Sequence, residues 1–403
     1  MPSRVLVRSR AATLCACLAA IVLAGCGTAS GGNSAVSVSG STLTVYASQP
    51  PGGSGGQAAA DTLDAEQLAL TQAGGKAGRF AVKLIKLDGA EISDNARSAI
   101  QNKTTIGYLG ELVPGTSQVS VEILNQQGVL VVSPADTASY LTQSTPAVPG
   151  SPTKYYPSRS TYHETFARVV PSTAAEAKAQ VQEMRSEGVS KLYVASDGQP
   201  YGAAIAQEVA QDAHQAGLSV VSGAGTEAAV KSSAADGMFY GASVDSQTAG
   251  KAAGTLLDGV SAAEPTIKLF APSGLYDAAF VSQLSPATQE RLTLSTPGFL
   301  PKDLTPAGKQ FGSSFRSAYG HQPATQAIFG YEAMSALLAV ISSAGANANN
   351  RADIVQDFRS IKDRQSAIGT YSIEGGDPSI APFVFSHVHS GQLVPERFLQ
   401  VQG

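Results

Sequence analysis

Short β-rich runs alternate with helical patterns along most of the chain. Eight runs of mainly apolar and β-branched residues are predicted strands: 43–47, 80–87, 105–109, 129–132, 191–195, 218–221, 238–240 and 267–271. Between them, apolar residues recur three or four positions apart, as at Ala177, Val181 and Met184, which is the period of an amphipathic helix. Thr173, with Glu176 three residues later, has the pattern of a capping box at the start of that helix.

This alternation predicts the fold class. Repeated strand–helix–strand units form parallel sheets with helices on both faces and right-handed connections. Two sets of four strands therefore predict an α/β protein with two similar, doubly wound lobes. Residues 142–171 separate the sets; their many prolines and lack of periodicity indicate a crossing segment or a long surface loop. Helical spacing returns at Phe311, Phe315 and Tyr319 and again over 334–341, and we expect these helices to pack back onto the first lobe.

The N-terminus has the features of an export signal. Three arginines within the first ten residues precede an apolar stretch, 11–23, that is too short to span a bilayer stably. The sequence Leu-Ala-Gly-Cys26 follows and resembles a bacterial lipobox, in which the cysteine is acylated and becomes the mature N-terminus. We therefore expect a signal peptide over 1–25, and lipidated Cys26 with a flexible tether of small polar residues over 26–41. The alternative is an ordinary secretory signal that happens to contain a cysteine.

Charge and composition exclude several classes of function. The chain has 403 residues, a length typical of two domains. Loss of the signal would leave 24 of the 27 basic residues against 31 acidic ones, and this acidic balance argues against a nucleic-acid partner. No second long apolar run is apparent, so we expect neither a channel nor a polytopic transporter. The two other cysteines, Cys15 and Cys17, leave with the signal, and no disulfide is expected.

Candidate functional residues should follow the strands, because ligand crevices in open parallel sheets lie beyond the carboxyl ends of the strands. The segments at these places are 48–56, 110–117, 133–137, 196–202, 241–245 and 272–276. They are short, contain glycine and carry hydroxyl groups, which suits hydrogen bonding to a small polar ligand. The glycines over 52–56 lack the lysine of a P-loop and the spacing of a dinucleotide fingerprint, so we interpret them as a turn and expect no cofactor.

Catalytic motifs are missing from the sequence. It contains no Gly-x-Ser-x-Gly elbow, no His-Glu-x-x-His motif and no cysteine nucleophile in the body. His387 and His389 would lie on one side of a strand, but no third ligand is indicated nearby, so no metal site is expected. We therefore expect a protein that is not an enzyme.

Four motifs carry a resemblance to a known family. They are Gly-Val-Leu-Val-Val-Ser-Pro-Ala-Asp-Thr at 128–137, Phe-Ala-Arg-Val-Val-Pro at 166–171, Tyr-Val-Ala-Ser-Asp-Gly-Gln-Pro-Tyr-Gly at 193–202 and Phe-Gly-Tyr-Glu-Ala-Met at 329–334. In this order, behind a lipobox, the chain over 42–403 resembles the type I extracellular solute-binding proteins of ATP-driven (ABC) importers, in particular the leucine/isoleucine/valine-binding group.

The resemblance implies two lobes that are joined by three hinge crossovers and close on a trapped ligand. The first lobe would comprise 42–168 and 297–368, and the second 169–296 and 369–403. It also implies a monomer, lipid-anchored on the outside of a bacterial cell membrane, that delivers a small polar solute to a permease and its ATPase. Thr137, with the backbone near Ala135 and Asp136, would hold a ligand carboxylate, and Tyr201 would contribute a hydroxyl from the second lobe.

Three departures from the family pattern concern the ligand. Pro114 replaces a serine of the amino-acid binders, which leaves Thr116 and Ser117 as the nearest hydroxyls. Ser243 stands where a tyrosine is expected, and Ser273 where an acid holds the α-ammonium group. A buried ammonium without a carboxylate is costly, so the α-amino-acid clamp is incomplete and the ligand need not be a standard amino acid. The residues that could restore it are Asp136, Asp245 and Glu111.

Two other functions fit the same sequence. A ligand sensor would present its closed form to a membrane signalling partner instead of a permease. A surface hydrolase could use the same scaffold, because a fold does not determine a function.

Overall fold

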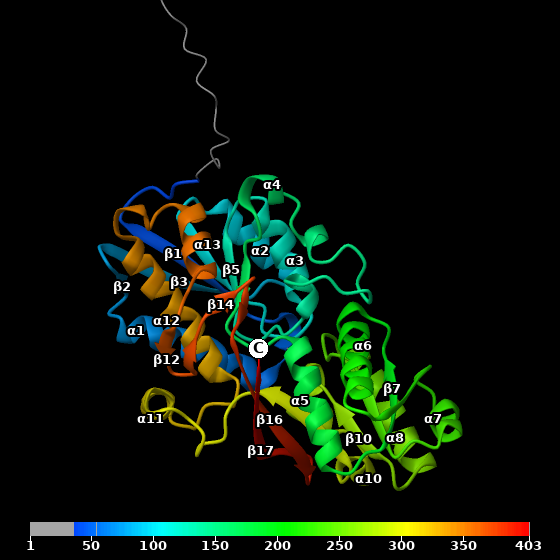
Figure 1. The fold of residues 1–403 in the computed structure, drawn as a ribbon. Helices are drawn as coiled ribbons and strands as arrows, with labels where there is room; N and C mark the ends of the chain where they lie inside the picture. Colours follow the sequence, from blue (N-terminus) through cyan, green and yellow to red (C-terminus); the bar gives the residue numbers. More distant parts are fainter. Residues whose placement is uncertain (1–35, 54, 403) are drawn as a thin grey trace, which may run out of the picture. The chain divides into compact units, whose positions relative to one another are not determined.

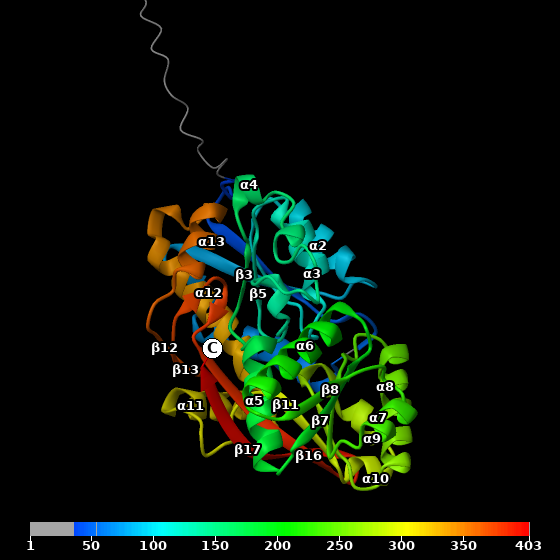
Figure 2. The same ribbon diagram turned by 45° about the vertical axis from the view of Figure 1, so that its right-hand side comes forward.

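The structure, a computed structural model, describes residues 36–53 and 55–402. The predicted signal peptide, Cys26 and the first part of the tether lie outside the described residues. From residue 36 the chain lies on the first lobe: Val38 is buried, and its N–H donates to the carbonyl of Asn349 at 2.7 Å. Figures 1 and 2 show the two lobes, each built around its own sheet.

Lobe 1 is built on a sheet with the order β2-β3-β1-β4-β5-β6. Its strands are β1 (Thr42–Ser48), β2 (Lys76–Ala77), β3 (Phe80–Leu87), β4 (Thr105–Leu109), β5 (Leu130–Ser133) and β6 (Phe166–Arg168). All pairs are parallel except β2 with β3. Neighbouring residues of one strand point to opposite faces: Val45 of β1 belongs to one buried cluster and Tyr46 to another.

Helices cover both faces of this sheet. One face packs against α1 (Gly56–Gln72), α11 (Pro306–Tyr319), α12 (Ala327–Ala344) and α13 (Arg351–Arg359). The other packs against α2 (Ile92–Gln101) and α3 (Ser117–Asn125), and α4 (Arg159–Tyr162) precedes β6. Helices α11 to α13 thus return to lobe 1, as their apolar spacing predicted.

Lobe 2 is built on a sheet with the order β17-β16-β11-β10-β9-β7-β8. Its strands are β7 (Lys191–Ser196), β8 (Ser219–Ser222), β9 (Gly237–Gly241), β10 (Lys268–Ala271), β11 (Leu292–Pro297), β16 (Ile380–His389) and β17 (Gln392–Gln402). One face carries α5 (Thr173–Ser186) and α6 (Pro200–Gln215). The other carries α7 (Glu227–Ser233), α8 (Gln247–Ala263), α9 (Ala278–Ser282) and α10 (Pro286–Gln289).

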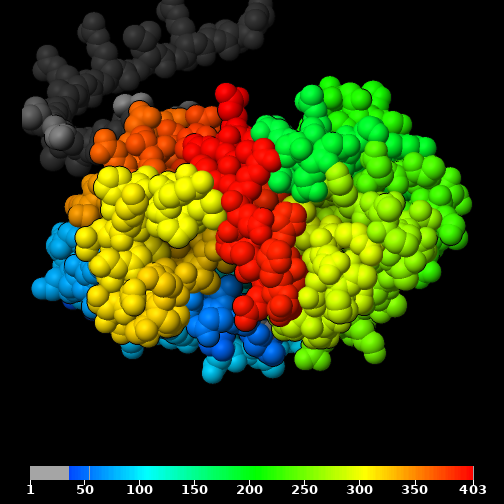
Figure 3. All heavy atoms as spheres, turned by 90° about the horizontal axis from the view of Figure 1, so that it is seen from below, coloured from blue at the N-terminus to red at the C-terminus, as the bar shows by residue number. Residues whose placement is uncertain are grey.

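The chain passes between the two sheets three times. It leaves lobe 1 after β6, returns after β11, and passes again into β16 through two small hairpins. These hairpins pair β12 (Arg364–Ser366) with β13 (Gly369–Tyr371), and β14 (Ile373–Glu374) with β15 (Asp377–Pro378). In Figure 3 the last segment, in red, runs as a band with lobe 1 on one side and lobe 2 on the other.

The predicted fold class is confirmed, and all eight predicted strands are present with ends that differ by no more than one residue. Sequence reasoning missed β6, β11 and β17, and it placed only residues 387–389 of β16 in a strand. The statement that the body has no second apolar run was wrong: residues Ala327–Asn347 are long and apolar enough to cross a membrane. Two thirds of that window is buried inside the protein, and α12 is a core helix of lobe 1.

The predicted capping box of α5 was also wrong. Ser172, not Thr173, is the N-cap residue, and its side chain makes no cap hydrogen bond. The Thr173 hydroxyl instead accepts a hydrogen bond from the N–H of Ser139 at 3.2 Å. Glu176 does not turn back to the start of the helix, because its carboxylate is bonded to residues of lobe 2, as described below.

Candidate functional site between the lobes

A small cavity lies between the two lobes at the carboxyl ends of their strands. Its volume is about 50 Å³. Lobe 1 lines it with Gly55, Ala58, Ala59, Thr62, Leu112, Val113, Pro114, Pro134, Ala135, Val170 and Gln326, and lobe 2 with Val244, Ser273, Gly274, Tyr276, Asp277, Thr296 and Pro297. Beside this small cavity, side chains of the two lobes are hydrogen-bonded to one another directly, as described next. The lobes are therefore closed on one another in this structure.

Four of the predicted site residues make contacts across the lobes. The Thr137 hydroxyl of lobe 1 lies 3.3 Å from the Ser273 hydroxyl and donates to the Tyr201 hydroxyl at 3.4 Å. The Tyr201 and Ser273 hydroxyls are 3.1 Å apart. Nearby, the Ser243 hydroxyl donates to the carbonyl of Pro114 at 2.8 Å. The structure thus brings Thr137, Tyr201, Ser243 and Ser273 to one interface, where all four side chains are buried.

The carboxylate of Glu176, on α5, holds Ser273 in place at this interface through hydrogen bonds. One carboxylate oxygen accepts from the Ser273 N–H and from the Ser295 hydroxyl, both at 2.6 Å. The other accepts from the Ser273 hydroxyl at 2.8 Å. Burial raises the pKa of Glu176 to about 7, and the hydrogen bonds from Ser295 and Ser273 limit the rise. Sequence reasoning missed this carboxylate, although an acid on the buried face of an apolar helical pattern is a usable signal.

Asp136 shapes the site without facing the cavity. Its carboxylate accepts from the backbone N–H groups of Gly115, Thr116 and Ser117 at 2.7–3.0 Å and from that of Ala138 at 3.0 Å. These donors include the otherwise unpaired N–H groups at the start of α3. Because both carboxylate oxygens of Asp136 already accept these hydrogen bonds, Asp136 is a poor replacement for the acid that the family pattern places at Ser273.

The two hydroxyls predicted beside Pro114 are also structural. The Thr116 hydroxyl donates to the carbonyl of Val113 at 2.7 Å, and the Ser117 hydroxyl accepts from the N–H of Glu111 at 3.0 Å. Neither residue lines the cavity, whereas Ala135 does.

The other two candidate acids, Glu111 and Asp245, line a neighbouring hollow of about 220 Å³. It shares the walls Leu112 and Val113 with the cavity, and Glu91 also lines it. Glu111 is fully buried and accepts from the Tyr108 hydroxyl at 2.8 Å. Burial raises its pKa to about 7, although hydrogen bonds oppose this shift.

Several residues that line the cavity were not predicted. Thr62 and Gln326 come from lobe 1, and Asp277 and Thr296 come from lobe 2, whereas Tyr276 lies in the segment 272–276 that the sequence indicated. Asp277 begins α9, where one of its carboxylate oxygens accepts from the Phe280 N–H at 2.8 Å. Its place directly after the segment 272–276 was the available signal.

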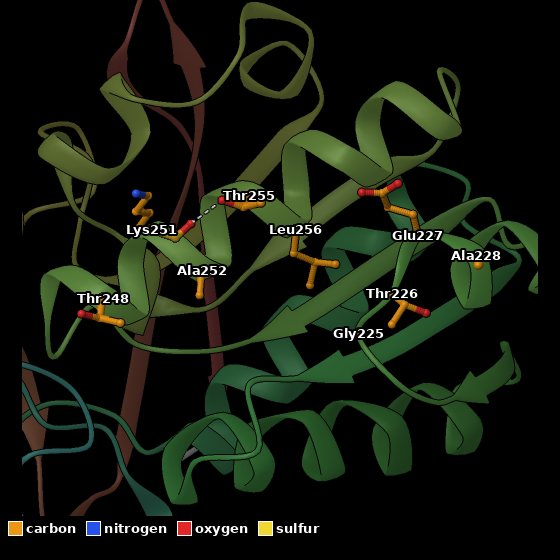
Figure 4. A pocket seen from close by; sticks show the side chains of 9 residues that line it. All are labelled: Gly225, Thr226, Glu227, Ala228, Thr248, Lys251, Ala252, Thr255 and Leu256. Atoms are coloured by element: carbon orange, nitrogen blue, oxygen red, sulfur yellow. Dashed lines mark hydrogen bonds between the residues drawn. The ribbon is translucent and has the colours of Figure 1, made fainter.

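A larger and more open hollow of about 750 Å³ lies on lobe 2 between α7 and α8 (Figure 4). Residues of lobe 2 alone line it, including Glu227, Lys251, Thr255 and Leu256. The Thr255 hydroxyl donates to the carbonyl of Lys251 within its own helix at 2.9 Å. One lobe alone forms this hollow, whereas ligand sites occur preferentially between domains. Among the residues that the structure describes, no group of three or more His, Cys, Asp or Glu side chains could hold a metal ion.

Comparison with known proteins agrees with the motifs found in the sequence. The model of a family described as "Periplasmic binding protein" matches residues 44–381. No curated protein sequence matches the chain.

Solved structures share the fold at low sequence identity. A leucine-binding protein from Thermotoga maritima superposes with a TM-score of 0.72 at 19% identity, over 89% of this chain and 98% of that one. A substrate-binding protein of an ABC transporter from Desulfitobacterium hafniense, in complex with leucine, gives 0.69 at 19% identity, over 88% and 100%. A solute-binding protein from R. palustris, in complex with benzoate, gives 0.66 at 17% identity, over 89% and 96%.

Proposed function

Because the chain belongs to the periplasmic binding protein family, we propose that it captures a small polar solute between its lobes and delivers it to the permease of an ABC importer. The observation that carries this proposal is the cleft itself: hydroxyls of both lobes, on Thr137, Tyr201 and Ser273, meet where the strands of the two sheets end. Solved structures of similar fold include complexes with leucine and with benzoate, which supports a small organic solute.

Capture would require opening and closing of the lobes. In the closed arrangement the cavity between the lobes measures only about 50 Å³. In an open form, the hydroxyl of Thr137 on lobe 1 would be exposed to solvent. The hydroxyls of Tyr201 and Ser273 on lobe 2 would be exposed as well. A solute that contacts both halves would then favour closure, because each half alone buries too little of it for tight binding.

The same proposal places the protein outside the cytoplasm on a lipid anchor. The basic, apolar and lipobox segments support acylation of Cys26 and removal of residues 1–25. Diacyl or triacyl modification would hold the protein stably at the membrane, whereas a single chain holds only marginally.

Native mass spectrometry of the purified mature protein tests the binding function. We expect a small molecule to co-purify at one copy per protein and to be released on unfolding. After refolding without it, calorimetric titration with the recovered molecule should show stoichiometric binding without turnover. Conversion of the molecule to a product would favour a hydrolase, and absence of any bound or titratable solute would contradict the proposal.

A further inference from the structure

A carboxylate of lobe 2 is hydrogen-bonded directly to lobe 1. Glu208 lies on α6, and its Oε1 accepts a hydrogen bond from the hydroxyl of Ser139 at 2.5 Å. Ser139 begins a short 3-10 helix of lobe 1, Ser139–Leu141. Its N–H donates to the hydroxyl of Thr173, at the start of α5, at 3.2 Å. This turn of lobe 1 therefore lies against two helices of lobe 2.

Apolar side chains of both lobes bury this contact. Ser139 is 1% exposed. Tyr140 and Leu141, which follow it, belong to the same buried cluster as Ile205 of α6. The Oε2 of Glu208 is buried and has no hydrogen-bond partner among the described residues. A carboxylate loses the favourable interactions of its charge with water when it is buried in this way, so the charged form is disfavoured while the lobes are together.

No positive charge compensates Glu208. The nearest charged groups are acids: Asp212 lies one turn further along α6, and Glu176 faces Glu208 from α5. Lys178 of α5 acts on Asp212. Arg168 of lobe 1 is bonded to two backbone carbonyls and to an acid of the third crossing. Burial therefore raises the pKa of Glu208 to about 7, although the hydrogen bonds from the hydroxyls of Ser139 and Thr173 oppose the rise.

We propose that Glu208 takes up a proton when the lobes close, so that acid favours the closed form. This inference rests on the proposed capture of a solute by closure and adds a regulation to it. In an open form Glu208 would face water, with a pKa near its ordinary value of 4.5. Between 4.5 and about 7 the closed form then holds more protons than the open form. Closure is favoured as the pH falls through this range, and the lobes separate more readily as the pH rises through about 7.

Glu176 does not account for the same effect. Its pKa is raised as well, but the donors to its carboxylate, Ser273 and Ser295, belong to lobe 2 as it does. Opening of the cleft leaves these hydrogen bonds in place. Glu208 differs because one of its donors belongs to the other lobe.

Single-molecule energy transfer tests the inference with the proton as the only ligand. Dyes are attached to cysteines introduced at exposed positions of the two lobes, Glu122→Cys on α3 and Lys251→Cys on α8, in the mature protein with Cys26→Ala. The protein is freed of solute by unfolding and refolding. We expect the ratio of closed to open molecules to rise about tenfold or more between pH 8 and pH 5.5, because the two pKa values of Glu208 bracket this range.

Glu208→Gln separates titration from packing. Glutamine is uncharged at both pH values, and its side-chain oxygen can still accept the hydrogen bond from Ser139. The variant should therefore show nearly the same ratio at pH 8 and pH 5.5, close to that of the unmodified protein at pH 5.5.

Glu183→Gln is the matched control. Glu183 is also a buried acid of lobe 2 with a raised pKa, but its ion-pair partner, Arg397 at 2.9 Å, belongs to β17 of the same lobe. This variant should keep the pH dependence of the unmodified protein.

Two results would overturn the inference: a ratio that does not change with pH in the unmodified protein, or a pH dependence that persists in Glu208→Gln. Either result leaves solute capture intact, because a solute can still drive closure at one pH. Failure of the solute recovered by native mass spectrometry to close the lobes would instead count against the proposed function.

Discussion

The guanidinium of Arg168 and the carboxylate of Asp377 form an ion pair, with Nε and Oδ1 2.8 Å apart, where the first and third crossings between the lobes lie side by side. Arg168 is completely buried. Its terminal nitrogens donate to the carbonyls of Asp136 and Ala138 at 2.9 and 2.7 Å, on either side of Thr137. The crossing segments are therefore connected directly to the loop that carries Thr137, whose hydroxyl contacts Ser273 of the other lobe.

Arg168→Gln should destabilise the protein strongly. The change leaves Asp377 without its ion-pair partner and the carbonyl of Asp136 without a donor, and breaking a buried pair in this way costs about 3–5 kcal/mol. Urea denaturation measures the free energy of unfolding. Lys86→Gln is the control, because the pair of Lys86 with Asp64 is partly exposed and its loss should cost less than about 1 kcal/mol. Similar losses in the two variants would contradict the role assigned to Arg168.

Gly115→Ala should hinder closure. A Cβ at Gly115 would lie 2.6 Å from the Cβ of Tyr201 on the other lobe, and the residue has φ +84°. Gly198→Ala is the matched control: φ is +77°, but nothing lies within 4 Å of the added carbon. Both changes place alanine in the left-handed backbone conformation, which should lower the free energy of unfolding by about 1 kcal/mol. Only Gly115→Ala should also weaken ligand affinity, by about tenfold or more. Equal affinities in the two variants would show that the lobes do not close through this contact.

Glu176 should make stability depend on pH. Its pKa is raised from 4.5 to about 7 in the folded protein, so between these values the folded state holds more protons than the unfolded state. Stability contributed by this group is therefore complete at low pH and falls as the pH rises from about 4.5 through about 7. Glu176→Gln removes this titration, so between pH 5 and 7.5 the unfolding free energy of the variant should fall by roughly 2–2.5 kcal/mol less than that of the unmodified protein. Parallel pH profiles for the two proteins would contradict the assignment.

Cys26→Ala should release the protein from the membrane. The change removes the thiol that would be acylated, and without acyl chains the acidic body has no strong attraction for the bilayer. Fractionation of cells that express each form, followed by immunoblotting, measures the distribution. A double change in the signal that leaves the lipobox intact, Cys15→Ser with Cys17→Ser, is the control and should stay with the membrane. Membrane retention of Cys26→Ala would refute the anchor.

The fold could be predicted from local patterns, and its missed parts have physical causes. Seven of the eight predicted strands lie inside their sheets, where burial favours apolar runs, and the eighth, β8, is an edge strand. Strand β6 has three residues and follows a proline-rich segment, so its only strong signal is its pairing with β5. Helix α12 is apolar on nearly all sides because it lies between the sheet and other helices. Its long apolar run was missed because a helix without a polar face does not show an amphipathic period in the sequence.

The site was less predictable because its contacts join distant parts of the chain. The motifs placed Thr137, Tyr201 and Ser273 in the cleft through family resemblance, but no local pattern indicates that their hydroxyls meet. Glu176 and Ser273 are 97 residues apart, and the Thr-x-x-Glu pattern is the same whether the glutamate turns back to cap its helix or reaches the next strand end. Asp277 was missed because a cap residue is ordinary, and only the folded structure shows that it borders the cavity.

The central claim, that the lobes close on a solute, is tested most directly by small-angle X-ray scattering of the mature protein with and without the solute recovered by native mass spectrometry. The stripped protein should populate an open form with a larger radius of gyration, because the closed cleft holds only about 50 Å³. Saturation with the solute should make the protein more compact and narrow its distance distribution. An unchanged radius of gyration at saturation would contradict the claim.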